Sequence, residues 1–319
     1  MFMNIKTLKW DPELLSAFSI PSHILPSLAS SAEVYGGITS GPLKGVPITG
    51  CLGDQQAALV GQKCFTPGSA KNTYGTGAFL LFNTGMEPVI TQGLLTTVAY
   101  QLGPSTPAVY ALEGSIAVAG AAVKWVCDNL GIVKHVDEIG ALAGHVKHTG
   151  GVYFVTAFAG LFAPYWRDDA RGTIVGITNY TTKHHIARAT LEAGCFQTRA
   201  ILDAMFKESG VRLHQLKVDG GVSNSDVAMQ IQADILGIDV VRPGMRETTA
   251  LGAAIAAGFA VGLWNSFDDL HDVNVEGLTT FKSRVSDKQR ETRYAQWEKA
   301  VERSYGWADV VESDSIDDD

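Results

Sequence analysis

Cysteine is scarce in this chain of 319 residues, and its four thiols lie far apart with no Cys-x-x-Cys pair. Disulfide frameworks and structural zinc sites both need regularly spaced cysteines, so neither is expected. Two pairs of histidines, His145 with His148 and His184 with His185, have no cysteine or carboxylate pattern beside them. No protein metal site is therefore predicted. Scattered free thiols are typical of a reducing compartment. We therefore expect a cytoplasmic location, with a mitochondrial association left open.

The chain also lacks a hydrophobic run long enough to cross a membrane. The longest run, residues 250–264, is shorter than the ~20 residues of a spanning helix and contains three glycines. It predicts a buried helix, and no stable membrane insertion is expected. Basic residues are also in deficit, with 25 Lys and Arg against 33 Asp and Glu. Because nucleic-acid binders carry a basic stripe, nucleic acid is not expected as a partner.

Acidic residues are concentrated at the C-terminal end of the chain. Residues 309–319 hold six acids and no base, which accounts for most of the net charge of −8. We expect residues 306–319 to form an acidic, disordered tail. The chain as a whole is 46% hydrophobic and contains 34 glycines. This composition is typical of a globular protein with many tight turns.

Strand-like and helix-like segments alternate along the body of the chain. The clearest helix is Ile186–Met205, where apolar residues recur every three or four positions. Other helices are expected at 11–18, 55–62, 115–130, around 227–235 and at 248–264. Strands are expected at 46–52, 73–82 (interrupted by a turn), 109–112, 152–158, 214–218 and 239–242. Strands alternating with helices indicate an α/β architecture.

An acidic residue, Asp54, stands where the expected strand 46–52 gives way to a helix. It fits an N-cap, whose carboxylate accepts from the free backbone N–H groups of the first helical turn. It also fits a general base at the carboxyl edge of an open α/β sheet, where such sheets place their ligands. On spacing alone the cap is the commoner arrangement, and the residues leave both hypotheses open.

Two glycine-rich turns are candidates for contacts to a ligand. Gly75–Gly77 lies between apolar arms, where glycine lets the backbone approach a phosphate and Thr76 offers a hydroxyl. An ordinary hairpin turn gives the same sequence, and no P-loop pattern follows. Gly220 and Gly221 come after the expected strand 214–218 and before a helix. That pair suits either a bound base or phosphate or a tight strand–helix turn.

Six short segments resemble motifs of one known family in their amino-acid sequence and in their order along the chain. They are Gly53–Leu59, Lys71–Gly77, Ala111–Gly114, Ala163–Trp166 with Ala170–Gly172, Val218–Gly221 and Thr249–Ala254. Together they resemble the glycerol kinases of the FGGY carbohydrate kinase family, over about residues 4–264. The resemblance implies an actin-like, ribonuclease H-like ATPase fold. In that fold two domains close over a cleft that holds glycerol and ATP with its Mg²⁺.

The resemblance also implies roles for matching positions. Asp54 would be the general base on a glycerol hydroxyl, Gln55 would bind another hydroxyl, and Phe79 would pack on the carbon chain. The nucleotide site would contain Thr76 at the ATP phosphates, with Gly120, Lys124, Gly221 and Ser225. The implied activity is ATP-dependent phosphorylation of glycerol to sn-glycerol 3-phosphate. Such a transfer depends on positioning, charge stabilisation and a carboxylate that accepts the hydroxyl proton.

The sequence departs from the family pattern at three places. Ser225 stands where the family usually has Asn, and Asn224 comes one residue earlier. Lys124 occupies a position filled by Gln or Arg in relatives. The glycine-rich phosphate hairpin and the Arg-Glu pair of the family's N-terminal domain have no counterpart before Asp54. We therefore expect residues 1–62 to be a remnant of that domain and residues 63–305 to be a complete C-terminal, nucleotide-binding domain.

Three hypotheses about function follow. The first is a glycerol kinase whose N-terminal part is missing, so that this chain alone is inactive or weakly active. The second is a non-catalytic module that binds a nucleotide or a protein partner. The third is a kinase for another polyol or sugar, because few of the glycerol-contacting positions are present. A homo-oligomer is compatible with all three.

Overall fold

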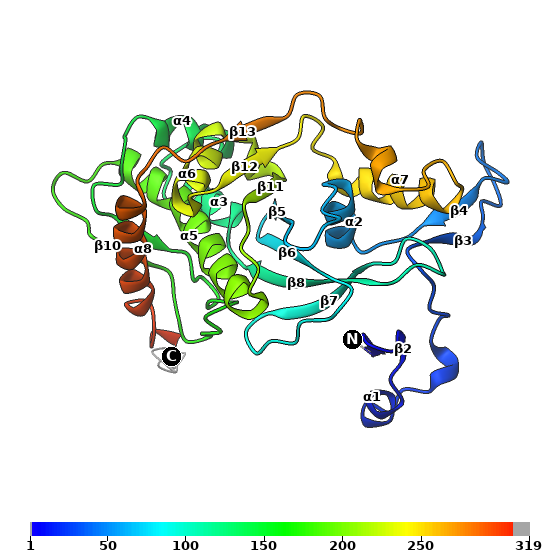
Figure 1. Ribbon diagram of the computed structural model, residues 1–319. Coiled ribbons are helices and arrows are strands. Elements are labelled where there is room, and N and C mark those ends of the chain that lie inside the picture. The colour runs from blue at the N-terminus through cyan, green and yellow to red at the C-terminus, as the bar shows by residue number, and fades with distance from the viewer. Residues whose placement is uncertain (1, 309–319) are drawn as a thin grey trace, which may run out of the picture. The chain divides into compact units, whose positions relative to one another are not determined.

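The structure, a computed structural model, describes residues 2–308, which fold into two compact units (Figure 1). Unit 1 comprises Met1–Ala70, Leu81–Glu113 and Glu247–Val275, and unit 2 comprises Lys71–Leu80, Gly114–Arg246 and Glu276–Asp319. Each unit is therefore built from segments that are separate in the sequence. The contiguous domains expected at 1–62 and 63–305 stay a prediction. Most of the expected acidic tail, from residue 309 onward, lies outside the described residues.

Unit 1 contains two small hairpins, a pair of packed helices and one end of a larger sheet. Its elements are β1 (Met3–Asn4), β2 (Lys9–Trp10), α1 (Pro12–Ala17), η1 (Ser22–Ile24), β3 (Ala32–Gly37), β4 (Pro47–Gly50), α2 (Asp54–Gly61), β7 (Leu95–Tyr100), α7 (Thr248–Ala260) and η4 (Phe267–Leu270), with parts of β6 (Ala78–Gly85) and β8 (Val109–Ile116). The strands β6, β8 and β7 are neighbours in that order. β7 and β8 are antiparallel, with Leu95 opposite Glu113.

The helices α2 and α7 pack closely in unit 1 (Figure 1). A Cβ atom on Gly61 would lie 1.9 Å from the Thr248 carbonyl oxygen, and one on Gly252 would lie 1.8 Å from the Ala57 carbonyl oxygen. Only glycine allows so close an approach of two backbones. Behind this contact, fully buried side chains from several segments form the core of the unit. They include Leu59, Val60, Leu81, Ile255 and Leu270.

The expectation of a buried helix at 248–264 is wrong in two respects. α7 ends at Ala260, and only one of its sides is buried. Thr248, Gly252 and Ile255 face the core, whereas Ala254 is exposed. Alanines dominate the helix, and their small apolar side chains are tolerated on an exposed face. No helix among residues 2–308 is both long enough and apolar enough to span a bilayer.

Unit 2 is a sheet with helices around it. Its elements are β5 (Ala70–Tyr74), α3 (Gly120–Asp128), η2 (Val136–Glu138), α4 (Ile139–Gly144), β9 (Tyr153–Val155), β10 (Thr173–Val175), α5 (Lys183–Ser209), β11 (Gln215–Asp219), η3 (Gly221–Asn224), α6 (Asp226–Leu236), β12 (Asp239–Arg242), β13 (Thr279–Phe281) and α8 (Asp287–Glu302). The strands of its larger sheet follow the order β13-β12-β11-β5-β6, and β9 and β10 form a separate antiparallel pair. β11 and β12 are parallel, whereas β12 and β13 are antiparallel. The alternation of strands and helices confirms the expected α/β architecture.

The long helix α5 is the centre of unit 2. It confirms the clearest helix expected from the sequence and extends it at both ends. Phe196 on α5 stacks against Trp297 on α8, with ring centroids 5.2 Å apart and planes 12° apart. Glu192, almost fully buried, receives hydrogen bonds from Arg188 at 3.0 Å and Arg293 at 2.8 Å. These contacts hold α8, which the sequence did not predict, against α5.

The helix expected at 115–130 begins later than predicted, at Gly120. Ser115 and Ile116 continue the strand β8, whose buried and less buried positions alternate from Leu112 to Ile116, and residues 117–119 connect it to the helix. Alanine and valine occur in both helices and strands, so composition alone could not locate the boundary. β7 was also missed, because its Thr-rich sequence lacks a clear alternation of polar and apolar residues.

Candidate functional site

The turn between β5 and β6 is fixed to the N-terminus of α3. The backbone N–H of Gly75 donates to the Gly77 carbonyl at 2.8 Å, which closes the turn. The amides of residues 119–121 then donate to the carbonyl oxygens of Gly75 and Thr76 at 2.9–3.0 Å. The first N–H groups of α3 are therefore satisfied by the turn itself. The backbone of Thr76 is held in place by these hydrogen bonds, and Thr76 is exposed to solvent.

The glycines near this turn differ in what surrounds them. A Cβ on Gly120 would lie 2.5 Å from the Gly75 carbonyl oxygen, and one on Gly77 would lie 2.4 Å from the Ile116 carbonyl oxygen. Gly220 has a φ of +82° and an equally close neighbour in the Tyr74 carbonyl. Gly221 has no atom within 4 Å of the position that a Cβ would take. The packing of the chain therefore explains three of these glycines but not Gly221.

A cavity of about 820 Å³ opens beside the turn, wholly within unit 2. All five residues that the sequence predicted for the nucleotide site line it: Thr76, Gly120, Lys124, Gly221 and Ser225. Apolar side chains make up much of the remaining wall, namely Val123, Val136, Ile139, Leu191, Val222 and Val227. The volume is within the roughly 300–1,000 Å³ of small-molecule sites. The fold thus brings together residues from five separate parts of the sequence, at 74–76, 120–124, 136–141, 191 and 221–227.

Ser225 and Asn224 contribute differently to this cavity. The Ser225 hydroxyl accepts a hydrogen bond from the Ala228 N–H at 3.2 Å and so caps α6. It also packs on Gly140, where a Cβ would lie 2.3 Å from the Ser225 Oγ atom. Asn224 is exposed and lines the cavity one residue earlier. Asn224 stands one residue before the position where the family usually has Asn. That displacement could have identified Asn224, although it was not predicted as a site residue.

Among residues 2–308, the charged residues that line the cavity are Lys124, Asp137 and Asp226. Lys124 forms an i,i+4 ion pair with Asp128, and its side chain is 72% exposed. The hydrogen bond to Asp128 raises the pKa of the Lys124 ammonium. Exposed pairs of this kind contribute little to stability, so Lys124 is able to exchange this partner for another anion. Asp137, from η2, lines the same cavity, and no sequence signal identified it.

In unit 1, Asp54 is the first residue of α2, and the N-cap is Gly53. The interpretation of Asp54 as the N-cap is therefore wrong. Its Oδ1 atom accepts from the Gln55 N–H at 2.8 Å, and the residue is exposed. A carboxylate at this position gains from the positive end of the helix dipole. The arrangement leaves the carboxylate accessible.

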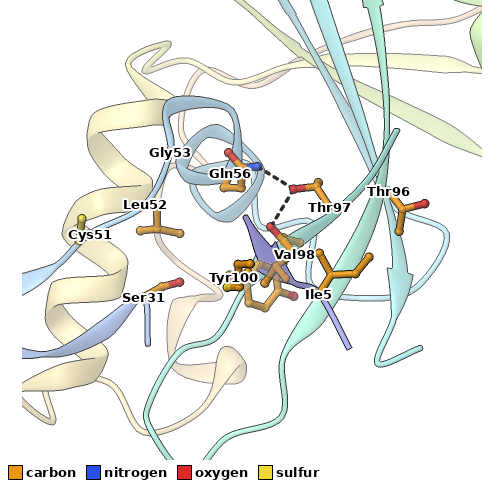
Figure 2. Close-up of a pocket in the computed structure, with 12 residues that line it drawn as sticks. Ile5, Ser31, Cys51, Leu52, Gly53, Gln56, Thr96, Thr97, Val98 and Tyr100 are labelled. Carbon is orange, nitrogen blue, oxygen red and sulfur yellow. Dashed lines mark hydrogen bonds between the residues drawn. The ribbon is translucent and has the colours of Figure 1, made fainter. Parts of the chain in front are cut away.

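A second cavity, of about 520 Å³, lies beside α2 in unit 1 (Figure 2). None of the acidic or basic side chains of residues 2–308 lines it; its polar groups are hydroxyls, a thiol and the Gln56 amide. Gln56 points toward β7, where its Nε2 atom donates to the Thr97 hydroxyl at 3.4 Å. Asp54 and Gln55 are not among its lining residues, because successive helical residues point in directions about 100° apart.

The residues predicted to bind the substrate are distributed over both units. Asp54 and Gln55 belong to unit 1, whereas Phe79 belongs to unit 2. Phe79 lies on β6 with 36% of its surface exposed, and its carbonyl accepts from the Lys71 ammonium at 3.2 Å. Neither unit by itself contains all three of these residues, whereas the five residues predicted for the nucleotide site all belong to unit 2.

Comparison with known proteins supplies the context for this geometry. The model of the C-terminal domain of the FGGY family of carbohydrate kinases matches residues 70–261. The model of the N-terminal domain of the same family matches residues 1–61. The chain belongs to the FGGY family of carbohydrate kinases. The actin-like, ribonuclease H-like fold expected from the sequence is thereby confirmed for this FGGY chain.

Several curated relatives of this FGGY chain are named glycerol kinase. The chain is 57% identical over 315 residues to the glycerol kinase of Mycolicibacterium gilvum. The aligned residues cover 97% of the chain and 62% of that relative. The chain is also 57% identical over 316 residues to the glycerol kinase of Mycobacterium tuberculosis strain H37Rv, covering 97% and 60%. The chain thus spans about 60% of the length of the relatives it matches.

Solved structures give the same picture. The glycerol kinase of Plasmodium falciparum with ADP superposes with a TM-score of 0.89 at 39% identity, over 95% of this FGGY chain and 61% of that chain. The xylulose kinase of Lactobacillus acidophilus gives a TM-score of 0.82 at 21% identity, over 96% and 63%. The second likeness establishes the fold alone.

Proposed function

We propose that this chain serves in the ATP-dependent phosphorylation of glycerol to sn-glycerol 3-phosphate. The observation that carries the proposal is the cavity in unit 2, around which the five expected nucleotide residues converge. The glycerol kinase structure that resembles the chain was solved with ADP. A nucleotide cavity is what a phosphotransferase of this family requires, and this one has a suitable volume.

The proposed nucleotide contacts follow from the chemistry of the cavity wall. Gly221 leaves space where any larger residue would place a Cβ, so the backbone is able to approach a phosphate or a ribose. The Thr76 hydroxyl and the Lys124 ammonium offer donors to phosphate oxygens. Valine and isoleucine side chains from α3, η2 and α4 offer a flat apolar surface to a base. Asn224 offers an amide that both donates and accepts.

The proposed acceptor side consists of Asp54, Gln55 and Phe79. ATP with its Mg²⁺, when bound, supplies the phosphoryl group and much of the positive charge that stabilises the transition state. The Asp54 carboxylate would accept the proton of the glycerol hydroxyl as the new P–O bond forms and the bond to ADP breaks. Gln55 would hold a second hydroxyl, and Phe79 would pack on the carbon chain.

No set of three or more His, Cys, Asp or Glu suited to a metal occurs among residues 2–308.

A non-catalytic nucleotide-binding module is the second candidate. The described residues that line the cavity all belong to unit 2, so the proposed nucleotide contacts would need no residue of unit 1. A kinase for another polyol or sugar is a third candidate, because only three residues argue for glycerol. Cytoplasmic location and a homo-oligomer also remain proposals.

Two measurements on the whole chain separate these candidates. Isothermal titration with ATP and with ADP, up to millimolar concentration, should show saturable binding; no heat of binding would remove every nucleotide-dependent candidate. Release of ADP from MgATP is then followed with and without glycerol. Glycerol-dependent release, even at the low rate expected of this chain alone, supports the phosphotransferase. Binding without glycerol-dependent release favours the nucleotide module, and release that depends on another polyol favours the third candidate.

A further inference from the structure

A buried polar network lies directly behind the nucleotide cavity and joins three elements of unit 2. It consists of Asn72 and Tyr74 on β5, Thr198 on α5 and Gln232 on α6, all no more than 2% exposed. Polar side chains are rarely buried so completely without a structural or functional reason. None of these four residues was assigned a role by the sequence, and only Tyr74 reaches the cavity wall.

The hydroxyl oxygens of Tyr74 and Thr198 lie 3.4 Å apart, and either could be the donor, whereas the other hydrogen bonds of this network have a defined direction. The Thr198 hydroxyl donates to the Gly194 carbonyl at 2.9 Å, so it accepts from the Asn72 amide at 3.2 Å. The Tyr74 hydroxyl donates to Gln232 Oε1, while the Gln232 amide donates to the Cys195 carbonyl at 3.2 Å. Burial raises the pKa of the Tyr74 phenol, which keeps this donor protonated.

The backbone of Tyr74 is held by residues beside the cavity. Its carbonyl lies so close to Gly220 that no Cβ would fit between them. The next residues, Gly75 and Thr76, accept the hydrogen bonds from the start of α3. Tyr74 therefore connects the interior network, through its side chain, with two edges of the cavity, through its backbone.

We infer that the hydroxyl of Tyr74, through its hydrogen bond to Gln232, is a positioning group that holds the Gly75–Thr76 turn in the geometry that binds nucleotide. This inference rests on the proposed nucleotide binding. Gln232 lies on α6, the helix that begins just after Asn224 and Ser225, which also line the cavity. One hydrogen bond thus couples β5, which leads into the Gly75–Thr76 turn, with α6, which follows the Asn224–Ser225 wall. Residues that touch no ligand but hold such elements change affinity by roughly 2- to 30-fold.

The test compares Tyr74→Phe with a matched loss of another buried hydroxyl. Tyr110→Phe is the control, because the Tyr110 hydroxyl is also mostly buried and donates to the Ile5 carbonyl at 2.7 Å, in unit 1. We expect Tyr74→Phe to weaken ADP binding by about tenfold and Tyr110→Phe to leave it within about twofold. Circular dichroism and thermal midpoints establish that both variants fold. Gln232→Leu, which also removes the hydrogen bond to the Cys195 carbonyl, should weaken ADP binding at least as much as Tyr74→Phe, and Tyr74→Phe should add no further loss in the Gln232→Leu background.

A second measurement does not depend on ligand. Hydrogen exchange of the amides of residues 119–121, which donate to the turn, should accelerate in Tyr74→Phe and not in Tyr110→Phe. A folded Tyr74→Phe that binds ADP like wild type overturns the inference, and so does unchanged exchange at these amides. Failure of the wild-type chain to bind ADP overturns both the proposed function and this inference. Wild-type binding with an unaffected variant overturns the inference alone.

Discussion

The carbonyl oxygen of Tyr74 lies where a Cβ atom on Gly220 would approach it to 2.4 Å. This contact joins the ends of β5 and β11, two strands from distant parts of the sequence. Gly220 also has a φ of +82°, which side-chain-bearing residues rarely adopt. Its neighbour Gly221 has neither constraint, although both residues belong to the same short motif.

This difference predicts opposite effects of two alanine substitutions. Gly220→Ala should destabilise unit 2 by about 1–3 kcal/mol or more, because it meets both a clash and an unfavourable φ. Gly221→Ala should change stability by less than about 0.5 kcal/mol but weaken ATP binding about tenfold, because its methyl group enters the cavity. Urea denaturation and calorimetric titration measure the two effects. Equal affinity for ATP in wild type and Gly221→Ala would argue against a nucleotide at this wall.

Removal of the buried carboxylate of Glu192 should strongly destabilise unit 2. Glu192→Ala leaves Arg188 and Arg293 without their shared partner, and uncompensated buried charge costs about 3–5 kcal/mol. The matched control is Glu208→Ala, on the same helix but exposed, which should change stability by less than about 0.5 kcal/mol. Chemical denaturation of both variants provides the comparison. Similar midpoints for the two would show that the ion pairs contribute nothing.

Acidification should weaken one contact of the segment that follows α8, the hydrogen bond from the Gly306 N–H to the Asp169 carboxylate. The hydrogen bonds from Arg167 lower the pKa of Asp169 from 3.8 to about 2, and Asp169 also accepts from the Gly306 N–H at 2.9 Å. Because the folded-state pKa is lowered, the stabilisation is complete above about pH 4. It disappears as the pH falls toward 2.

The protection of the Gly306 amide against hydrogen exchange should therefore be constant from pH 7 to about pH 4 and fall below it. In Asp169→Asn the protection should be lower and should not show this acid-dependent step. The Ala300 amide inside α8 serves as an internal reference in both proteins. The same pH profile in wild type and variant would refute the contribution of the carboxylate.

Asp54→Asn should separate catalysis from binding. The residue is exposed and accepts only one local hydrogen bond in the described structure, so the fold should be unaffected within about 0.5 kcal/mol. Glycerol-dependent ADP release should fall about 100-fold or more if its carboxylate is the general base. The affinity for ATP should remain that of wild type. Glu87→Gln, another exposed acid of unit 1, controls for the change in net charge. Turnover that survives Asp54→Asn would exclude the proposed base.

The sequence alone determined the family, the α/β class and the positions of most elements. Helices such as α5 and α6 could be predicted because apolar side chains repeat with the helical period, which is a local property. The motif around Asp54 was recognisable for the same reason, since its residues are consecutive.

Only the tertiary structure decided which residues meet. It gathered Thr76, Lys124 and Gly221 around one cavity, although about 50 and 100 residues of sequence separate them. It also assigned the Ser225 hydroxyl to the cap of α6, and it showed that α8 is held by the buried charge of Glu192. These outcomes depend on packing between distant segments, which no local period records.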